Sequence, residues 1–242
     1  MTEGTFVGFL AFIALIGLIL VASLKTMGPF NLSPQQELLT VSGMSQTDVA
    51  PDEAVLTLQV VSRGDTAKDV SAENRQALSD VMTALAGQEL PAGAVETTGL
   101  LLDRWTEWDP KSQTMMERGY EQITTLKVTV TDMESVGAVL DAAVNAGANS
   151  VQEIVFQLRP ETEQKLKEAA LREATAAAKA KAKVLAEASG AKLGKIASLS
   201  ETSEVRPWYY APKAAAVDTA PTPINPQKVT VTASVNMAYE LK

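Results

Sequence analysis

Hydrophobic and polar residues alternate most clearly toward the C-terminal end of the sequence. Between residues 229 and 241 the odd positions carry Val, Ala, Met, Tyr or Leu, and the even positions are mostly polar. Successive side chains of a strand point to opposite sides of a sheet, so this pattern predicts an antiparallel strand with one face in water. Similar patterns predict six more strands, at 38–44, 54–61, 97–108, 118–131, 151–158 and 193–199.

Two of these strands have a well-defined inner face. Alternation assigns the following side chains to the core: Ala54, Leu56, Leu58 and Val60 in the one strand, and Leu126, Val128 and Val130 in the other. The sequence Asp109-Pro110-Lys111 between 97–108 and 118–131 is a turn signal, so these two strands are expected to form a hairpin.

Three stretches with helical spacing separate the strands. Asp65 is expected to cap a helix at 65–85, Asp132 one that ends near Gly147, and Pro160 opens a helix at 160–189 that Gly190 terminates. The first two carry apolar stripes: Val70, Leu78, Val81, Met82 and Leu85, and then Val136, Val139, Leu140 and Val144. The third is rich in alanine, which permits close packing on a sheet or another helix.

The order of elements is ββ-α-ββ-α-β-α-ββ, which is not the strict alternation of a doubly wound parallel sheet. It predicts an α+β fold, with antiparallel sheets and helices packed on one face. Residues 38–242 form the folded region, in which 95–189 is a possible inserted subdomain. Five prolines between 206 and 227 predict a loop or arm.

The first 24 residues predict a membrane segment. Residues 5–24 are apolar and carry no charge, which is the length needed to cross a bilayer as one helix. The n-region lacks Lys and Arg, so a retained anchor is favoured over a cleaved signal, although an uncleaved signal stays open. Gly4, Gly8 and Ala11 are spaced for helix–helix packing, with plain lipid contact as the alternative. Residues 25–37 then form a short tether.

Charge and composition exclude several classes of function. The chain has 21 Lys and Arg against 29 Asp and Glu, for a net charge of −8, and this acidic balance argues against nucleic acid as a partner. Cysteine and histidine are both absent, which excludes thiol catalysis and the common zinc sites. We therefore expect no cofactor, no metal, no catalytic residue and no enzyme activity.

The predicted hairpin carries the first candidate binding surface. Trp105 and Trp108 precede its turn, and Met115 and Met116 follow it. Aromatic residues and Met are enriched in the cores of protein interfaces, which favours a surface for an oligomer or another partner. Local packing of the hairpin on its own sheet is the open alternative.

A second candidate lies in the proline-rich region. Trp208, Tyr209 and Tyr210 are adjacent to one another and need a surface on which to dock. A neighbouring subunit is the preferred interpretation, while a membrane-surface belt and an intramolecular lid remain open.

Two polar clusters have simpler interpretations. Asp52 and Glu53 are expected to form a turn that leads into a strand, and Lys179, Lys181 and Lys183 to lie on a solvated helical face.

The end of the long predicted helix reads Ala180-Lys-Ala-Lys-Val-Leu185-Ala-Glu-Ala-Ser-Gly190. Seven shorter segments accompany it along the chain, at 39–43, 50–54, 97–100, 119–120, 146–148, 155–156 and 193–195. In this order they resemble the SIMPL-domain (DUF541) family over about 38–241, and the helix end is the most specific of them. The resemblance implies an extracytoplasmic, self-assembling α+β module, some members of which form ring-like or barrel-like oligomers. It carries over no catalytic residue, and a retained anchor would depart from the exported members.

Together these observations predict a structural protein that is held in the membrane by a single pass, with its folded domain outside the cytoplasm. Its expected partners are copies of itself and, through residues 5–24, the lipid bilayer. The alternative is a binding module on the envelope side that recognises a peptide, glycan or protein through Trp105 and Trp108. A carboxylate-based hydrolase is a third hypothesis.

Overall fold

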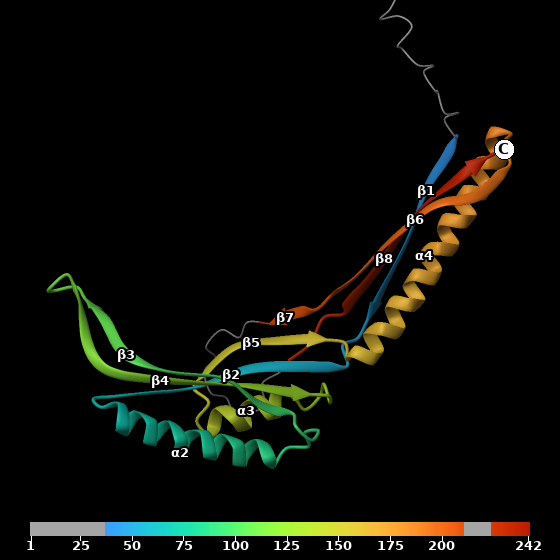
Figure 1. Ribbon diagram of the computed structural model, residues 1–242. Coiled ribbons are helices and arrows are strands. Elements are labelled where there is room, and N and C mark those ends of the chain that lie inside the picture. The colour runs from blue at the N-terminus through green and yellow to red at the C-terminus, as the bar shows by residue number, and fades with distance from the viewer. Residues whose placement is uncertain (1–36, 211–223) are drawn as a thin grey trace, which may run out of the picture.

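The computed structural model describes residues 37–210 and 224–242, which form two antiparallel sheets with a helical layer on one face of each (Figure 1). One sheet has three strands and the other five, and they lie end to end in a bent, elongated molecule (Figure 1). The predicted α+β class and antiparallel sheets are confirmed. The predicted membrane helix and residues Gly4, Gly8 and Ala11 lie outside the described residues.

The three-stranded sheet joins distant parts of the chain in the order β1-β8-β6. These strands are β1 (Leu38–Val49), β8 (Val229–Leu241) and β6 (Leu193–Arg206). The alternation that predicted β8 is confirmed, because Val229, Val231, Ala233, Val235 and Met237 are all buried beneath the helix α4 (Pro160–Ser189).

Helix α4 has the bounds that the sequence predicted. Its buried side chains recur every four residues, namely Ala170, Ala174, Ala178, Ala182 and Ala186. This stripe of methyl groups lets the helix axis come close to the sheet, and Gly43 of β1 lies beneath it. Gly190 takes a left-handed conformation, with φ of 75°, and ends the helix.

The five-stranded sheet has the order β3-β4-β2-β5-β7. The strands are β2 (Glu53–Gly64), β3 (Val95–Asp109), β4 (Thr114–Val130), β5 (Ser150–Gln157) and β7 (Trp208–Tyr210). Helices α2 (Ala67–Ala86) and α3 (Val136–Asn145) cover one face (Figure 1). The inward residues predicted for β2 and β4 are all buried there.

Some predicted features differ from the structure. Thr66, not Asp65, caps α2, because its hydroxyl accepts from the Asp69 N–H at 3.2 Å. Asp132 forms a turn before α3, which begins only after Ser135. Met82 and Val144, both assigned to apolar stripes, are 41% and 43% exposed, because they lie at the margins of their helix faces.

The C-terminal third also contains more strand than predicted. β6 continues beyond residue 199 to Arg206, because β8 supplies a partner along its whole length. Trp208–Tyr210, expected in a loop, pairs with β5 as β7. The segment 95–189 coincides with neither sheet, since β2 lies outside it and α4, inside it, packs on the three-stranded sheet. Among the described residues, no helix is long and apolar enough to cross a membrane.

Candidate interaction surface on the β3–β4 hairpin

The hairpin of β3 and β4 projects beyond α2 at one end of the molecule (Figure 1). The turn is fixed by Asp109, whose carboxylate accepts from the Lys111 N–H at 3.1 Å and the Ser112 hydroxyl at 2.8 Å. The first of these bonds, with help from the second, lowers the pKa of Asp109. Gln113 completes the turn with a left-handed φ of 53°. The predicted turn is therefore confirmed.

The hairpin bends where Gly119 meets Gly64 of β2. Gly119 has a φ of 125°, and a Cβ on it would lie 2.3 Å from the Gly64 carbonyl oxygen, so no other residue fits without a shift of the backbone. The register with β3 also shifts next to this point, between Trp105 and Thr106. A bulge of this kind bends a strand, and the tip of the hairpin curves away from the sheet (Figure 1).

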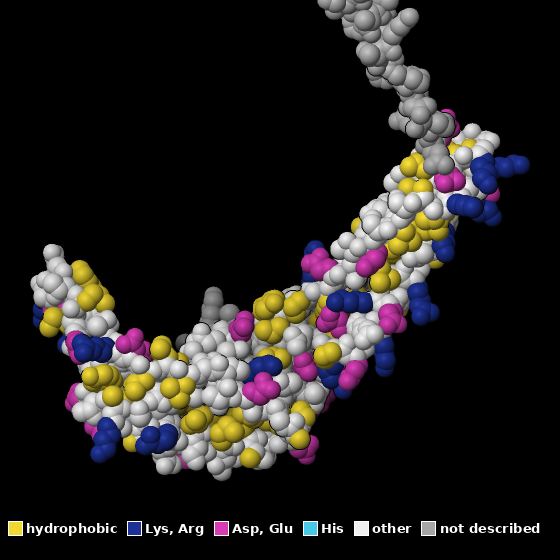
Figure 2. All heavy atoms as spheres, in the orientation of Figure 1, with side chains coloured by type: hydrophobic (Ala, Val, Ile, Leu, Met, Phe, Trp, Pro, Cys, Tyr) yellow, Lys and Arg dark blue, Asp and Glu magenta, His cyan; other side chains and the backbone are white. Residues whose placement is uncertain are grey.

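Large apolar side chains are exposed along this hairpin. At the tip, Trp108 lies opposite Met115, and the two are 55% and 59% exposed, while Met116 is 42% exposed. Leu100, Leu101 and Leu102 on the edge strand β3 are 67%, 55% and 41% exposed. Hydrophobic side chains are visible on the projecting end in Figure 2. We define these six residues as the hairpin surface.

Charged pairs flank the apolar residues of the tip. Arg104 pairs with Glu117, and Arg118 with Glu107, each at 3.3 Å across the two strands. All four side chains are about half exposed, so each pair contributes little to stability. A polar rim around an apolar centre is the usual arrangement at protein interfaces.

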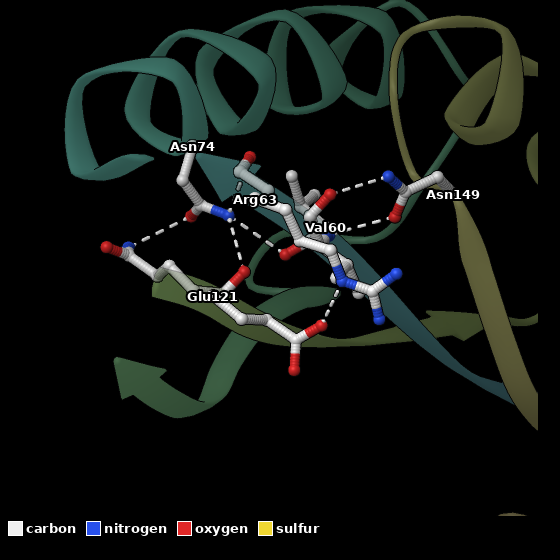
Figure 3. Close-up of polar contacts among 8 residues, drawn as sticks. Val60, Arg63, Asn74, Glu121 and Asn149 are labelled. Carbon is white, nitrogen blue, oxygen red and sulfur yellow. Dashed lines mark hydrogen bonds and ion pairs between the residues drawn. The ribbon is translucent and has the colours of Figure 1, made fainter. Parts of the chain in front are cut away.

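Trp105 lies in a different environment from Trp108. The Arg63 guanidinium lies 4.7 Å from the centroid of its ring, a cation–π contact, and Arg63 also pairs with Glu121 of β4 (Figure 3). Trp105 is accordingly only partly exposed. Of the four residues singled out in the hairpin, this one packs locally and the other three are open to solvent.

A shallow depression of about 580 Å³ lies next to the Arg63–Glu121 pair. Among its lining residues are Gln59, Arg63, Glu121 and Asn149. Asn149 is held by β2, because its side-chain amide donates to the Val61 carbonyl at 2.7 Å and accepts from the Val61 N–H at 2.8 Å (Figure 3). This depression could not be predicted from any one segment, because its walls come from β2, β4 and α2 and from the residues around the start of β5.

A buried polar cluster supports the same region from the helix side. Asn74 of α2 donates to the Val60 carbonyl at 2.9 Å and accepts from Gln122 at 3.1 Å (Figure 3). It also accepts from the Thr124 hydroxyl at 2.6 Å. Asn74 is only 1% exposed, so these bonds replace its contacts with water. The cluster fixes α2 on β2 and β4, and hence the base of the hairpin.

The aromatic residues of β7 lie on the opposite edge of the same sheet from β3. The Trp208 ring lies 5.1 Å from Phe156 and 5.9 Å from Tyr210, and both Trp208 and Tyr210 contact the core beneath the sheet. Tyr209 points away and is 63% exposed. The structure therefore does not bring the two predicted surfaces together, and two of these three aromatic side chains pack within their own chain.

Asp52 and Glu53 serve separate contacts at the junction of the two sheets. Asp52 accepts from the Arg159 N–H at 2.7 Å and from the Thr162 hydroxyl at 2.6 Å. Partial burial raises the pKa of Asp52, but these bonds outweigh it and the pKa is lowered. Glu53 instead accepts from Gln157 at 2.7 Å. Within the described ranges, no group of three or more acidic side chains is arranged to hold a metal ion.

Residues 39–239 match the family model SIMPL, described as a protein of unknown function (DUF541). The chain belongs to the SIMPL family. The match runs from β1 to the last part of β8, so the SIMPL unit comprises both sheets and the hairpin. The predicted family is confirmed.

Curated relatives of this SIMPL chain are found in Brucella. Proteins named "26 kDa periplasmic immunogenic protein" from Brucella melitensis and Brucella abortus are each 28% identical to it over 179 residues. The alignment covers 70% of this chain and 70% of each relative.

Proposed function

We propose that this SIMPL protein is a membrane-tethered, extracytoplasmic structural protein that assembles with copies of itself. The observation that carries the proposal is the hairpin surface, in which three large apolar side chains are exposed at the projecting tip and three more along the edge strand β3. Exposed apolar patches of this kind mark interaction sites on soluble proteins. A second copy of the chain is the partner we favour.

The membrane placement rests on the sequence and on the relatives. Residues 5–24 have the length and composition of a membrane span. The Brucella relatives carry the word periplasmic in their names, which supports a folded domain outside the cytoplasm.

The hairpin surface suits self-association for energetic reasons. Fully burying one Leu or Met side chain contributes about 1.5–3 kcal/mol. The flanking Arg–Glu pairs are already neutralised within the hairpin, so a partner would not have to bury an uncompensated charge.

The mass of the full-length protein in detergent tests the proposal. Light scattering is expected to give a discrete mass many times 25.7 kDa for the unmodified chain. Replacing Leu101, Trp108 and Met115 with Ser should shift the mass toward that of the monomer. Val184→Ser is the matched control, because Val184 is 62% exposed on α4, away from the hairpin. A monomeric unmodified chain would rule out the assembly.

A second candidate function is a binding module on the envelope side. The depression beside Trp105 favours it, because Arg63, Glu121 and Asn149 offer both charges and hydrogen-bonding groups to a peptide, glycan or protein. Under this hypothesis the chain is a monomer that retains a partner in pull-down experiments. Changing Trp105 and Trp108 to Ala would release that partner.

A further inference from the structure

The far end of the three-stranded sheet brings together both ends of the described fold. Lys192 and Lys242 exchange backbone hydrogen bonds of 2.8 and 2.9 Å, and the Leu241 N–H donates to the Glu37 carbonyl at 3.0 Å. The end of α4 lies beside them (Figure 1). This end, which we name the terminal end, is therefore the point from which residues 1–36 depart.

Lysines gather at the terminal end although the chain as a whole is acidic. Along the second half of α4 and around the ends of β6 and β8 are six exposed lysines: Lys179, Lys181, Lys183, Lys192, Lys195 and Lys242. The acidic side chains of the same segments are Glu37, Glu187 and Glu240. Figure 2 shows the basic side chains along the outer flank and at the tip of this part of the molecule.

Contacts within the fold account for little of this charge. Lys181 donates to the Ser42 carbonyl and covers the edge of β1, which is a structural role. Lys183 pairs with Glu187 at 4.0 Å, but these side chains are 75% and 67% exposed, so the pair is weak. The dipole of α4 does not explain the lysines either, because its last turn contains Glu187 and no basic residue.

The terminal end is also the part of the described fold nearest in sequence to the apolar segment 5–24. Only residues 25–36 lie between them, and a chain of that length spans at most about 40 Å. Attraction between lysines and an anionic surface fades over about 10 Å at 0.1 M salt, so contact requires the fold to lie on the membrane.

We infer that the terminal end binds the anionic phospholipid headgroups of the membrane in which residues 5–24 are anchored. This inference rests on the proposed membrane tether and adds an orientation to it. The lysines hold the α4 end against the bilayer, and the hairpin surface at the other end of the molecule then faces away from the membrane (Figure 1).

Site-specific fluorescence tests this contact in the full-length protein. The sequence has no cysteine, so Ala188→Cys gives a single labelling site at the end of α4. Energy transfer from this dye to an acceptor on lipid headgroups is measured in vesicles of phosphatidylcholine, with or without phosphatidylglycerol. Transfer should be higher in the vesicles that contain phosphatidylglycerol. The excess should disappear at about 1 M salt, where the Debye length is about 3 Å.

Two matched variants separate lysine contact from tethering. Replacing Lys192, Lys195 and Lys242 with Gln should abolish the excess transfer, whereas replacing Lys68, Lys111 and Lys228 with Gln should preserve it. Equal transfer in both kinds of vesicle, or an excess that the first variant retains, would overturn the inference. Flotation of the protein with both kinds of vesicle reports on the tether alone, so its loss would contradict the membrane tether instead.

Discussion

Gly43 of β1 lies directly beneath Ala174 of α4, and a Cβ added to Gly43 would lie 2.0 Å from the Ala174 carbonyl oxygen. The next turn of the helix is nearly as close, since the added Cβ would lie 2.5 Å from the Ala178 backbone nitrogen. The glycine and the alanine stripe are thus two halves of one contact. Gly43 and the last two alanines of the stripe, Ala182 and Ala186, belong to segments on which the resemblance to the SIMPL family rests, and close packing of helix on sheet gives a physical reason for these small residues.

Gly43→Ala is expected to destabilise the protein by about 1–3 kcal/mol or more, because the obstructing atoms are backbone and cannot rotate away. Urea unfolding followed by circular dichroism measures the change. Gly99→Ala is the control, since a Cβ there would meet Thr125 at an ordinary 3.6 Å. A loss of stability no larger than that of the control would contradict the close approach.

Asn74→Ala is expected to cost about 1–3 kcal/mol or more, because Thr124 and Gln122 would be left without their buried acceptor. Thermal unfolding provides the measurement. Gln76→Ala removes an exposed amide from the same helix, where it donates only to Asp80, and should have little effect. Similar melting temperatures for the two variants would show that the cluster does not hold α2 in place.

The hydrogen bonds that Asp52 accepts from Arg159 and Thr162 at the junction of the two sheets predict that stability depends on pH. The folded-state pKa of Asp52 is lowered, so its carboxylate stabilises the fold above the ordinary value of 3.8, and that stability is lost as the pH falls through the folded-state pKa. Asp52→Asn should therefore destabilise the fold at about pH 6 and destabilise it less at about pH 3, where part of this stabilisation is already lost. Unfolding in urea at both values measures this, with the exposed Asp80→Asn as control. A cost that is equal at both pH values would assign no role to the charge.

The aromatic residues of β7 should separate into two classes. Trp208→Ser removes a ring that packs on Phe156 and is expected to cost about 2 kcal/mol or more, whereas Tyr209→Ser should leave the melting temperature nearly unchanged. Tyr209→Ser is therefore the variant with which to test whether the β7 edge of the sheet takes part in assembly. Marked unfolding by Tyr209→Ser would contradict its exposed position.

Local signals in the sequence were sufficient for many elements. Both ends of helix α4 could be predicted because Pro160 favours the first turn of a helix and Gly190 favours the left-handed conformation that ends one. Strand β8 could be predicted because burial of one face requires alternating apolar and polar residues. β7 was missed because the strand it pairs with, β5, lies some fifty residues earlier in the chain, and three aromatic residues between prolines show no alternation. The pairing of two distant strands cannot be predicted from the sequence of either strand alone.

The candidate surface was predictable in part for the same reason. Trp108, Met115 and Met116 flank a turn, which is a local signal, and the structure leaves all three exposed. The environment of Trp105 depends on Arg63 from another strand and on the bend at Gly119, neither of which could be inferred from the hairpin sequence. The gathering of lysines at the terminal end likewise depends on how three separate segments meet.

The position of β8 at the centre of the three-stranded sheet has a consequence for the time course of folding. The Thr230 hydroxyl donates to Asp48 at 2.8 Å across a separation of 182 residues, and β1 and β6 are joined only through β8. Contacts this distant form slowly, since the entropy of closing the loop must be overcome first. During synthesis, the part of the alanine stripe that packs on β8 therefore stays exposed until residues 229–241 have been made. A product truncated before β8 would keep that part of the stripe in water, which would make it a substrate for chaperones and proteases.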